Sequence, residues 1–94
     1  MQTFKGNISG SIKQVANNIP SGIMTYSLVN KSGGAAVVNV YISDNVSIDI
    51  SVVPLNLTLA TGDALYCTNG IRVPAGSSIY LTTTASVDYY FNID

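Results

Sequence analysis

Strict alternation of apolar and polar residues between positions 46 and 61 is the feature that most limits what this chain can fold into. The apolar positions of this segment are Ile48, Ile50, Val52, Leu55, Leu57 and Leu59. A period of two places every second side chain on one face of a β-sheet, whereas an amphipathic helix needs apolar residues three and four positions apart. The segment therefore predicts two β-strands that meet at Pro54, each with one dry and one wet face.

Shorter runs of the same kind fill most of the remaining chain. Together with the alternating segment, they predict strands at residues 23–30, 35–43, 46–53, 55–61, 64–68, 71–73, 77–84 and 87–93. Turn-forming residues separate several of these strands, namely Asp44-Asn45, Gly62-Asp63, Asn69-Gly70 and Pro74-Ala75-Gly76. Tight turns between sequential strands imply antiparallel pairing. Seven to nine short strands at intervals of about ten residues predict an all-β fold, an antiparallel β-sandwich of jelly-roll or Greek-key-like topology.

The first twenty residues carry a weaker pattern. The spacing of Ile8, Ile12 and Val15 would permit a helix, but Gly6 and Gly10 and the many Ser and Asn residues disfavour one. We therefore expect residues 1–20 to form an amino-terminal arm or an irregular edge strand. Residues 21–94 are expected to form the β-sandwich domain.

Charged residues are sparse. They make up 10% of the 94 residues and leave a net charge of −1, whereas a typical chain has about 25%. This composition lacks the basic footprint of a nucleic-acid-binding protein and the basic cluster of a membrane-surface protein. A near-zero net charge also weakens the repulsion between copies. We interpret it as a sign of a protein that works within an assembly, with a small soluble domain of polar, uncharged surface as the alternative.

Residues for catalysis or metal binding are scarce as well. The chain has no His, and its five acidic residues are all Asp. The lone Cys67 has no His partner and is expected in the core. The Asp44-Asn45 and Gly62-Asp63 turns each offer one carboxylate, which falls short of the six to eight oxygen ligands that Ca²⁺ takes. We therefore predict no enzymatic activity, no cofactor and no metal site.

Tyrosines provide the only candidate functional residues. Tyr66, Tyr80 and Tyr90 fall on the polar phase of their predicted strands. If they were adjacent, they would form an exposed aromatic patch suited to a protein interface or to a sugar. The alternative is that each is an isolated, half-buried tyrosine.

The carboxy-terminal part of the chain resembles a known group of proteins. The resemblance rests on residues 53–59 (VPLNLTL), Gly62-Asp63, residues 73–81 (VPAGSSIYL) and residues 87–91 (VDYYF). This rhythm is similar to that of small structural proteins of tailed-bacteriophage virions, and it covers about residues 37–93. The resemblance implies a virion component, either a capsid decoration or auxiliary protein or a small tail or fibre module. It implies no active site.

Composition and resemblance together predict a non-enzymatic virion structural protein. We expect it to bind neighbouring capsid subunits and to stabilise the particle. Its expected partners are other virion proteins, such as the major capsid or tail protein, and further copies of itself, with a trimer as one candidate. The first residues, MQTFKGN, contain no hydrophobic run of the kind found in a signal peptide. We therefore expect synthesis in the host cytoplasm and residence in the virion. The alternative is a phage tail, fibre or adhesion module that binds host-surface carbohydrate through Tyr80 and Tyr90.

Overall fold

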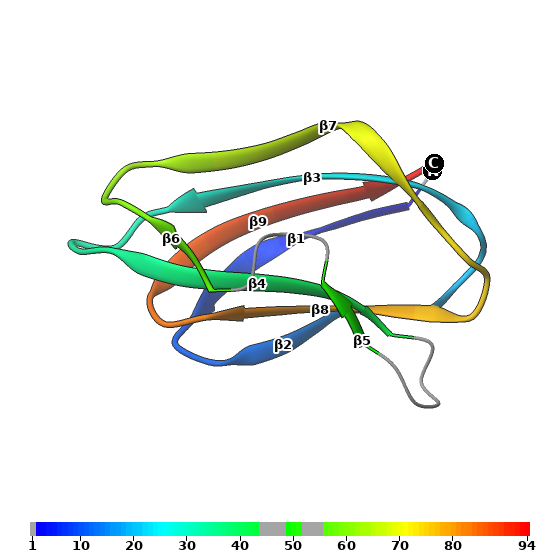
Figure 1. Ribbon diagram of the computed structural model, residues 1–94, viewed down its shortest axis with the longest axis horizontal. Helices are drawn as coiled ribbons and strands as arrows, with labels where there is room; N and C mark the ends of the chain where they lie inside the picture. Colours follow the sequence, from blue (N-terminus) through cyan, green and yellow to red (C-terminus); the bar gives the residue numbers. More distant parts are fainter. Residues whose placement is uncertain (1, 44–48, 52–55) are drawn as a thin grey trace.

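The computed structural model describes residues 2–43, 49–51 and 56–94 (Figure 1). These residues form nine β-strands: β1 (Gln2–Ser9), β2 (Ile12–Ile19), β3 (Gly22–Asn30), β4 (Ala36–Ser43), β5 (Asp49–Ser51), β6 (Leu57–Leu59), β7 (Ala64–Val73), β8 (Ser77–Thr83) and β9 (Ser86–Ile93). Within the described ranges there is no helix long and apolar enough to cross a membrane.

The strands form two antiparallel sheets that pack against each other (Figure 1). The four-stranded sheet has the order β1-β9-β3-β7, and the five-stranded sheet has the order β2-β8-β4-β5, with β6 also paired to β4. The chain passes back and forth between the sheets, so that β1, β3, β7 and β9 lie in one and the other strands lie in the second. The shortest dimension of the molecule is 20 Å, as expected for two sheets whose backbones lie about 10 Å apart. The predicted all-β antiparallel sandwich is confirmed.

The core lies between the sheets and follows the alternation of the sequence. Along β9, Val87, Tyr89, Phe91 and Ile93 are buried while Tyr90 between them is exposed. In the five-stranded sheet, strand β4 lies between β8 and the short strands β5 and β6, and it is buried along most of its length. Burial of these apolar side chains stabilises the fold by roughly 25 cal/mol for each Å² removed from water.

Tyr26 stacks in this core, and its hydroxyl group is affected by the surroundings. Its ring lies 5.2 Å from that of Phe91, at 26° to it. Burial raises the pKa of Tyr26 to about 12, and the neighbouring Cys67 adds an electrostatic contribution in the same direction. In the unfolded chain a tyrosine ionises near a pKa of about 10. The preference of the folded state for the neutral phenol therefore stabilises the protein fully below about pH 10, and this contribution is lost as the pH rises toward about 12.

Because its pKa is raised, Tyr26 is expected to ionise at a higher pH than an ordinary tyrosine. In an alkaline titration followed by phenolate absorbance, one ionisation near pH 12 should be present in the wild-type protein and absent from Tyr26→Phe. Far-ultraviolet circular dichroism at each pH separates this step from alkaline unfolding. A late ionisation that persists in Tyr26→Phe would show that another tyrosine is responsible.

The first residues of the chain form edge strands. Among the described strands, β1 pairs with β9 alone, at one edge of the four-stranded sheet, and β2 pairs with β8 alone, at one edge of the five-stranded sheet. The register of β2 is interrupted twice, between Gln14 and Ala16 and between Ala16 and Ile19. Whether residues 1–20 behave as an arm separate from the 21–94 domain stays a prediction.

The prediction of a hairpin turn at Asn69-Gly70 was wrong. Both residues lie inside β7, which runs unbroken from Ala64 to Val73 along β3. The register between these strands shifts at this point, and Gly70 has a φ of +83°. A glycine with positive φ serves a β-bulge as readily as a two-residue turn, so the same residue pair fits both structures.

Gly70 at this bulge has no room for a side chain. A Cβ there would lie 2.5 Å from Ile23 Cγ2, and the positive φ would strain any L-residue. We expect Gly70→Ala to lower the free energy of unfolding by about 1–3 kcal/mol, measured by urea denaturation. Gly33→Ala is the matched control, because a Cβ at Gly33 would have no atom within 4 Å. Equal midpoints for the two variants would contradict this account of the bulge.

The alternating segment that most constrained the prediction is only partly described. The Asp44-Asn45 turn and residues 46–48 and 52–55 lie outside the described residues, and the rest of the segment contributes the short strands β5 and β6. One expectation within it was wrong: Ile50, predicted on the dry face, is 59% exposed. The described residues of its strand β5 pair with Tyr41, Ile42 and Ser43 at the end of β4. Alternation reports which face a residue occupies, whereas burial also requires the opposite sheet to extend over that face.

Candidate functional site

The outer face of the four-stranded sheet brings two of the three predicted tyrosines together. The register places Ser27 of β3 opposite both Tyr90 of β9 and Tyr66 of β7, and Tyr90 is in turn opposite Lys5 of β1. Paired residues share a face, so these four side chains form a row across the sheet, which we call the tyrosine row (Lys5, Tyr90, Ser27 and Tyr66). Tyr66 is 67% exposed and Tyr90 is 43% exposed. The row therefore presents two aromatic side chains to solvent with a small residue between them.

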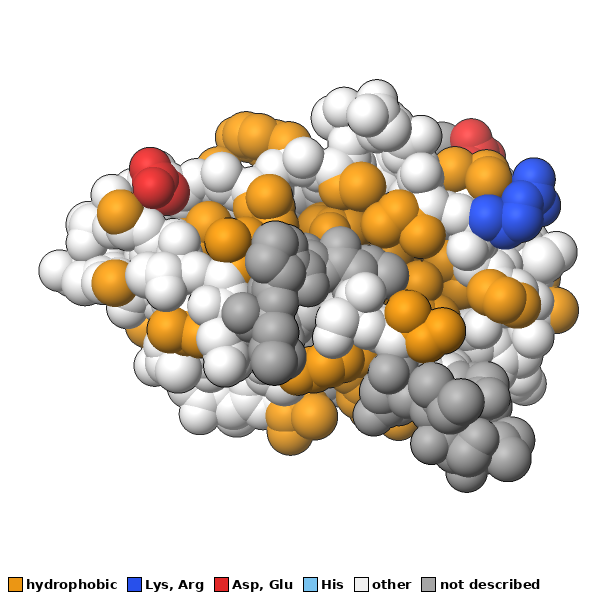
Figure 2. Space-filling view, viewed as in Figure 1, with side chains coloured by type: hydrophobic (Ala, Val, Ile, Leu, Met, Phe, Trp, Pro, Cys, Tyr) orange, Lys and Arg blue, Asp and Glu red, His pale blue; other side chains and the backbone are white. Residues whose placement is uncertain are grey.

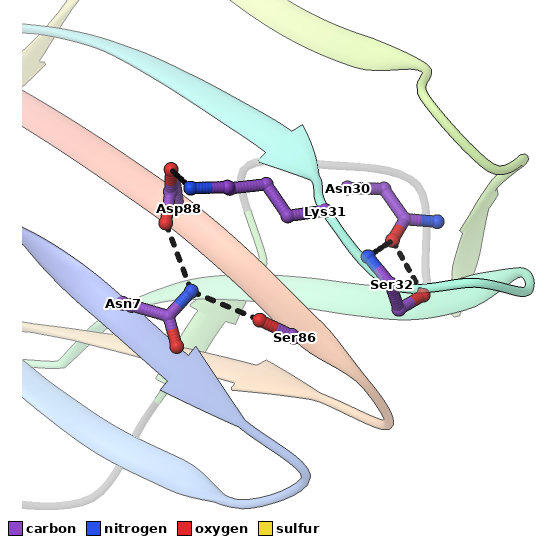
Figure 3. A network of polar contacts seen from close by, with 6 residues as sticks. All are labelled: Asn7, Asn30, Lys31, Ser32, Ser86 and Asp88. Carbon is purple, nitrogen blue, oxygen red and sulfur yellow. Dashed lines mark hydrogen bonds and ion pairs between the residues drawn. The ribbon is translucent and has the colours of Figure 1, made fainter.

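A polar network lies beside the tyrosine row, on the same face (Figure 3). Asn7 of β1 donates from Nδ2 to Asp88 Oδ1 at 2.8 Å and to Ser86 Oγ at 3.0 Å. Lys31, just after β3, places its Nζ 3.2 Å from Asp88 Oδ2. The hydrogen bond from Asn7 and the Lys31 ammonium outweigh desolvation and hold the pKa of Asp88 below its usual value. Asp88 is thus a fixed carboxylate held by groups from both sides of β9.

The surface between the row and the network is hollowed. An open depression of about 630 Å³ lies over β1, β9 and β3, and Lys5, Asn7, Ser27, Asp88 and Tyr90 are among the residues that line it. Every strand beneath it is described along its whole length. This depression is the candidate functional site of the molecule.

Tyr80, the third predicted interface residue, lies on the outer face of the other sheet. The register places it opposite Gln14 and Tyr41, and Gln14 Nε2 donates to the Tyr80 hydroxyl at 2.9 Å. It lines a separate depression of about 460 Å³ together with Tyr41 and Ile12, whose side chain is 65% exposed. The structure thus places Tyr66 and Tyr90 on one face and Tyr80 on the opposite one.

Sequence reasoning did not single out the polar partners of the tyrosines. Lys5 and Asn7 belong to the weakly patterned first third of the chain, and Lys31 follows a strand in a glycine-rich loop. Asp88 was counted only among the five acidic residues, to which no role was assigned. The alternation within each strand indicates which of its residues face outward. It does not indicate that β1 pairs with β9, which is the pairing that brings Asn7 to Asp88.

The site supports binding rather than a reaction. Its groups are one carboxylate, amide and hydroxyl groups, two ammonium groups and two phenol rings. In the part of the chain that the structure describes, no three His, Cys, Asp or Glu side chains come together as a metal site would require. Cys67 is half-buried and faces Tyr26 across the β3–β7 pair.

Comparison with known proteins gives a match in structure alone. No family model and no curated protein matches the sequence. Two solved structures are similar, both crystal structures of a pentameric capsid protein isolated from metagenomic phage sequences. The first has a TM-score of 0.56 at 11% identity over 97% of this chain, and the second a TM-score of 0.55 at 14% identity over 97%. The chain spans only 62% and 61% of the length of these two proteins. At such identities the likeness establishes a shared fold.

Proposed function

We propose that this chain is a non-enzymatic structural protein of a bacteriophage virion, located in the capsid. The observation that carries the proposal is the arrangement of its strands, which 97% of the chain shares with pentameric phage capsid proteins. We assign the orders β1-β9-β3-β7 and β2-β8-β4, with β5 and β6 beside β4, to a jelly roll, since consecutive strands alternate between the two sheets. Jelly rolls recur in viral capsid domains, which supports this assignment.

Within the virion, we assign the chain to a decoration or auxiliary role. In this role it binds neighbouring capsid subunits, including the major capsid protein, and stabilises the particle. Residues 1–20 would contribute through β1 and β2, whose outer edges pair with no other described strand. An open strand edge is a template for a further strand from a neighbouring subunit.

The proposal includes a closed ring of copies. A ring with an odd number of members requires a head-to-tail contact, in which each copy uses two different surfaces. The pentameric state of the structural neighbours favours five copies over the trimer considered from sequence. The outer face of the five-stranded sheet can supply one of these surfaces and an open strand edge the other.

The outer face of the five-stranded sheet is the one we assign to contact between copies. Its described members include Ile12, Gln14, Asn39, Tyr41, Tyr80 and Thr82, none of which is charged. Interface centres are depleted of charge and enriched in aromatic residues, as these six residues are. Figure 2, which looks across both sheets, shows the charged side chains near the two ends of the molecule.

Light scattering on a sizing column tests the ring. We expect a discrete oligomer whose mass is five times that of the 9.9 kDa chain. Ile12→Lys, which places a charge on the assigned contact face, should shift the mass toward the monomer. Ile23→Lys makes the same change on the outer face of the other sheet and should leave the mass unchanged. A monomer at every concentration of the wild-type chain would refute the ring.

A tail, fibre or adhesion module remains the second candidate. The exposed Tyr66 and Tyr90 beside a polar depression favour it, since aromatic and polar groups together suit a host-surface carbohydrate. Electron microscopy of virions labelled with antibody against the chain distinguishes the two candidates, because label on the head supports the capsid role and label confined to the tail supports the second.

A further inference from the structure

The depression on the outer face of the four-stranded sheet has the make-up of a ligand site. It spans three strands, and the aromatic ring of Tyr90 lies at its side, with the more exposed Tyr66 beyond Ser27. Ligand sites combine an apolar or aromatic surface with a few fixed polar groups. We propose that this depression binds a neutral saccharide. The proposal does not depend on the capsid role, and it specifies the ligand class and the residues for the carbohydrate binding named in the second candidate role.

The polar groups are held in place before any ligand arrives. Asp88 accepts from Asn7 on one side and is paired with Lys31 on the other, while Asn7 also donates to Ser86 (Figure 3). These contacts tie together β1, β9 and the residue that follows β3. Groups that are already ordered lose little conformational freedom on binding, which favours affinity.

The network keeps unused hydrogen-bonding capacity on both the donor and acceptor side. A carboxylate has about four acceptor positions, and the contacts to Asn7 and Lys31 occupy one on each oxygen of Asp88. The Oδ1 of Asn7 points away from the network (Figure 3). Lys31 uses one donor toward Asp88, and the exposed Lys5 offers an ammonium group at the row beside it. Neighbouring donors and acceptors match hydroxyl groups, which both donate and accept.

The charges of the site do not favour one sign of ligand. The depression is lined by one carboxylate, that of Asp88, and one ammonium group, that of Lys5. Asp88 and Lys31 neutralise each other at 3.2 Å. An uncharged polyhydroxyl compound uses all these groups without opposing any of them.

The tyrosine row supplies the apolar contact that a sugar ring needs. Adjacent strands lie about 4.8 Å apart, so Tyr90 and Tyr66, two strands apart, are separated by roughly 10 Å. A pyranose ring can lie over Ser27 in this interval, with its apolar C–H face against a tyrosine ring and its hydroxyl groups toward Asp88 and Asn7. Tyrosine is suited to this contact because its ring is apolar and its hydroxyl is polar.

A glycan array probed with the full chain, followed by NMR titration with free methyl glycosides of glucose, galactose, mannose and N-acetylglucosamine, tests the proposal. We expect at least one neutral glycan to bind and to shift the backbone resonances of residues around Tyr90 and Asp88. Tyr90→Ala should weaken binding roughly tenfold, and Tyr90→Phe should retain it, since the ring face is kept. Asp88→Asn keeps the shape but removes the charge and replaces one acceptor oxygen with a donor NH2 group, so it should also weaken binding.

Tyr80→Ala is the matched control, because Tyr80 lies on the opposite sheet. It should leave the affinity for a free methyl glycoside unchanged in the NMR titration, because this ligand is monovalent and its binding does not depend on a ring of copies. Circular dichroism of each variant establishes that it is folded. The proposal is overturned if no neutral glycan binds the wild-type chain, or if binding survives Tyr90→Ala. It is also overturned if the resonances of this face respond to added virion protein but to no glycan, because the face would then be a protein interface.

Discussion

Replacing Asn30 with aspartate is expected to lower the free energy of unfolding by about 3 kcal/mol or more, because a single buried amide connects three segments of the chain. Asn30 is 2% exposed. Its Nδ2 donates to the carbonyl oxygens of Gly34, Leu59 and Ala60 at 2.9, 3.0 and 3.1 Å. Its Oδ1 accepts from the backbone N–H and the hydroxyl of Ser32 at 2.9 and 2.7 Å.

Aspartate has the shape of asparagine but lacks both of these N–H donors. The substitution would set a carboxylate oxygen against three carbonyl oxygens in a site closed to water, and an uncompensated buried charge is strongly destabilising. Urea denaturation measures the effect. Asn69→Asp, the same change at an exposed position in β7, is the control and should stay within about 0.5 kcal/mol of the wild-type protein. A similar shift in both variants would show that Asn30 does not hold these segments together.

Replacing Phe91 with alanine is expected to cost about 3–5 kcal/mol. Phe91 is fully buried on β9, stacked on Tyr26 and tilted against Tyr89 at a ring distance of 6.0 Å. β9 is an interior strand between β1 and β3, so the cavity would open in the centre of the four-stranded sheet. A domain of this size has a total stability of roughly 5–15 kcal/mol, so the variant should be close to unfolding at ambient temperature.

Thermal and urea unfolding followed by circular dichroism measure this loss. Tyr90→Ala removes an aromatic ring from the adjacent position of the same strand, but from its solvent-facing side. We expect it to cost less than half as much as Phe91→Ala. Equal losses would contradict the assignment of Phe91 to the core and of Tyr90 to the outer face.

Much of the fold could be predicted because alternation acts within one strand. In β9 the buried and exposed positions follow the sequence pattern residue by residue, and the Pro74-Ala75-Gly76 turn appears where predicted, with Gly76 at a φ of +84°. Pairing between distant strands is a different kind of information. β1 lies beside β9 although some eighty residues separate Asn7 from Asp88, and no local pattern specifies such a neighbour.

The difference between alternation within a strand and pairing between distant strands also explains which parts of the candidate site could be predicted. Local phase correctly indicated that Tyr66, Tyr80 and Tyr90 point outward, but not that Tyr80 belongs to the other sheet. The polar half of the site was missed because Asn7, Lys31 and Asp88 gain their meaning only from being adjacent. Asn69-Gly70 shows the limit at short range, since one residue pair serves either a turn or a bulge and the pairing of β7 with β3 decides between them.

The fold and the sparse charge together describe a subunit suited to assembly. A sandwich with open strand edges, one outer face that carries Ile12 and Tyr80, and one outer face with a polar network has separate surfaces for neighbours and for a ligand. If both proposals hold, a ring of copies would present several saccharide sites at once, and multivalent contact would raise the avidity well above the affinity of one site.

Density-gradient sedimentation of a lysate from cells that produce this protein is the most direct test of the virion role. The account predicts that the chain, followed by antibody, sediments with intact phage particles and stays with them after a second gradient. Recovery of the chain only in the slowly sedimenting soluble fractions, while the major capsid protein of the same lysate sediments with particles, would contradict it.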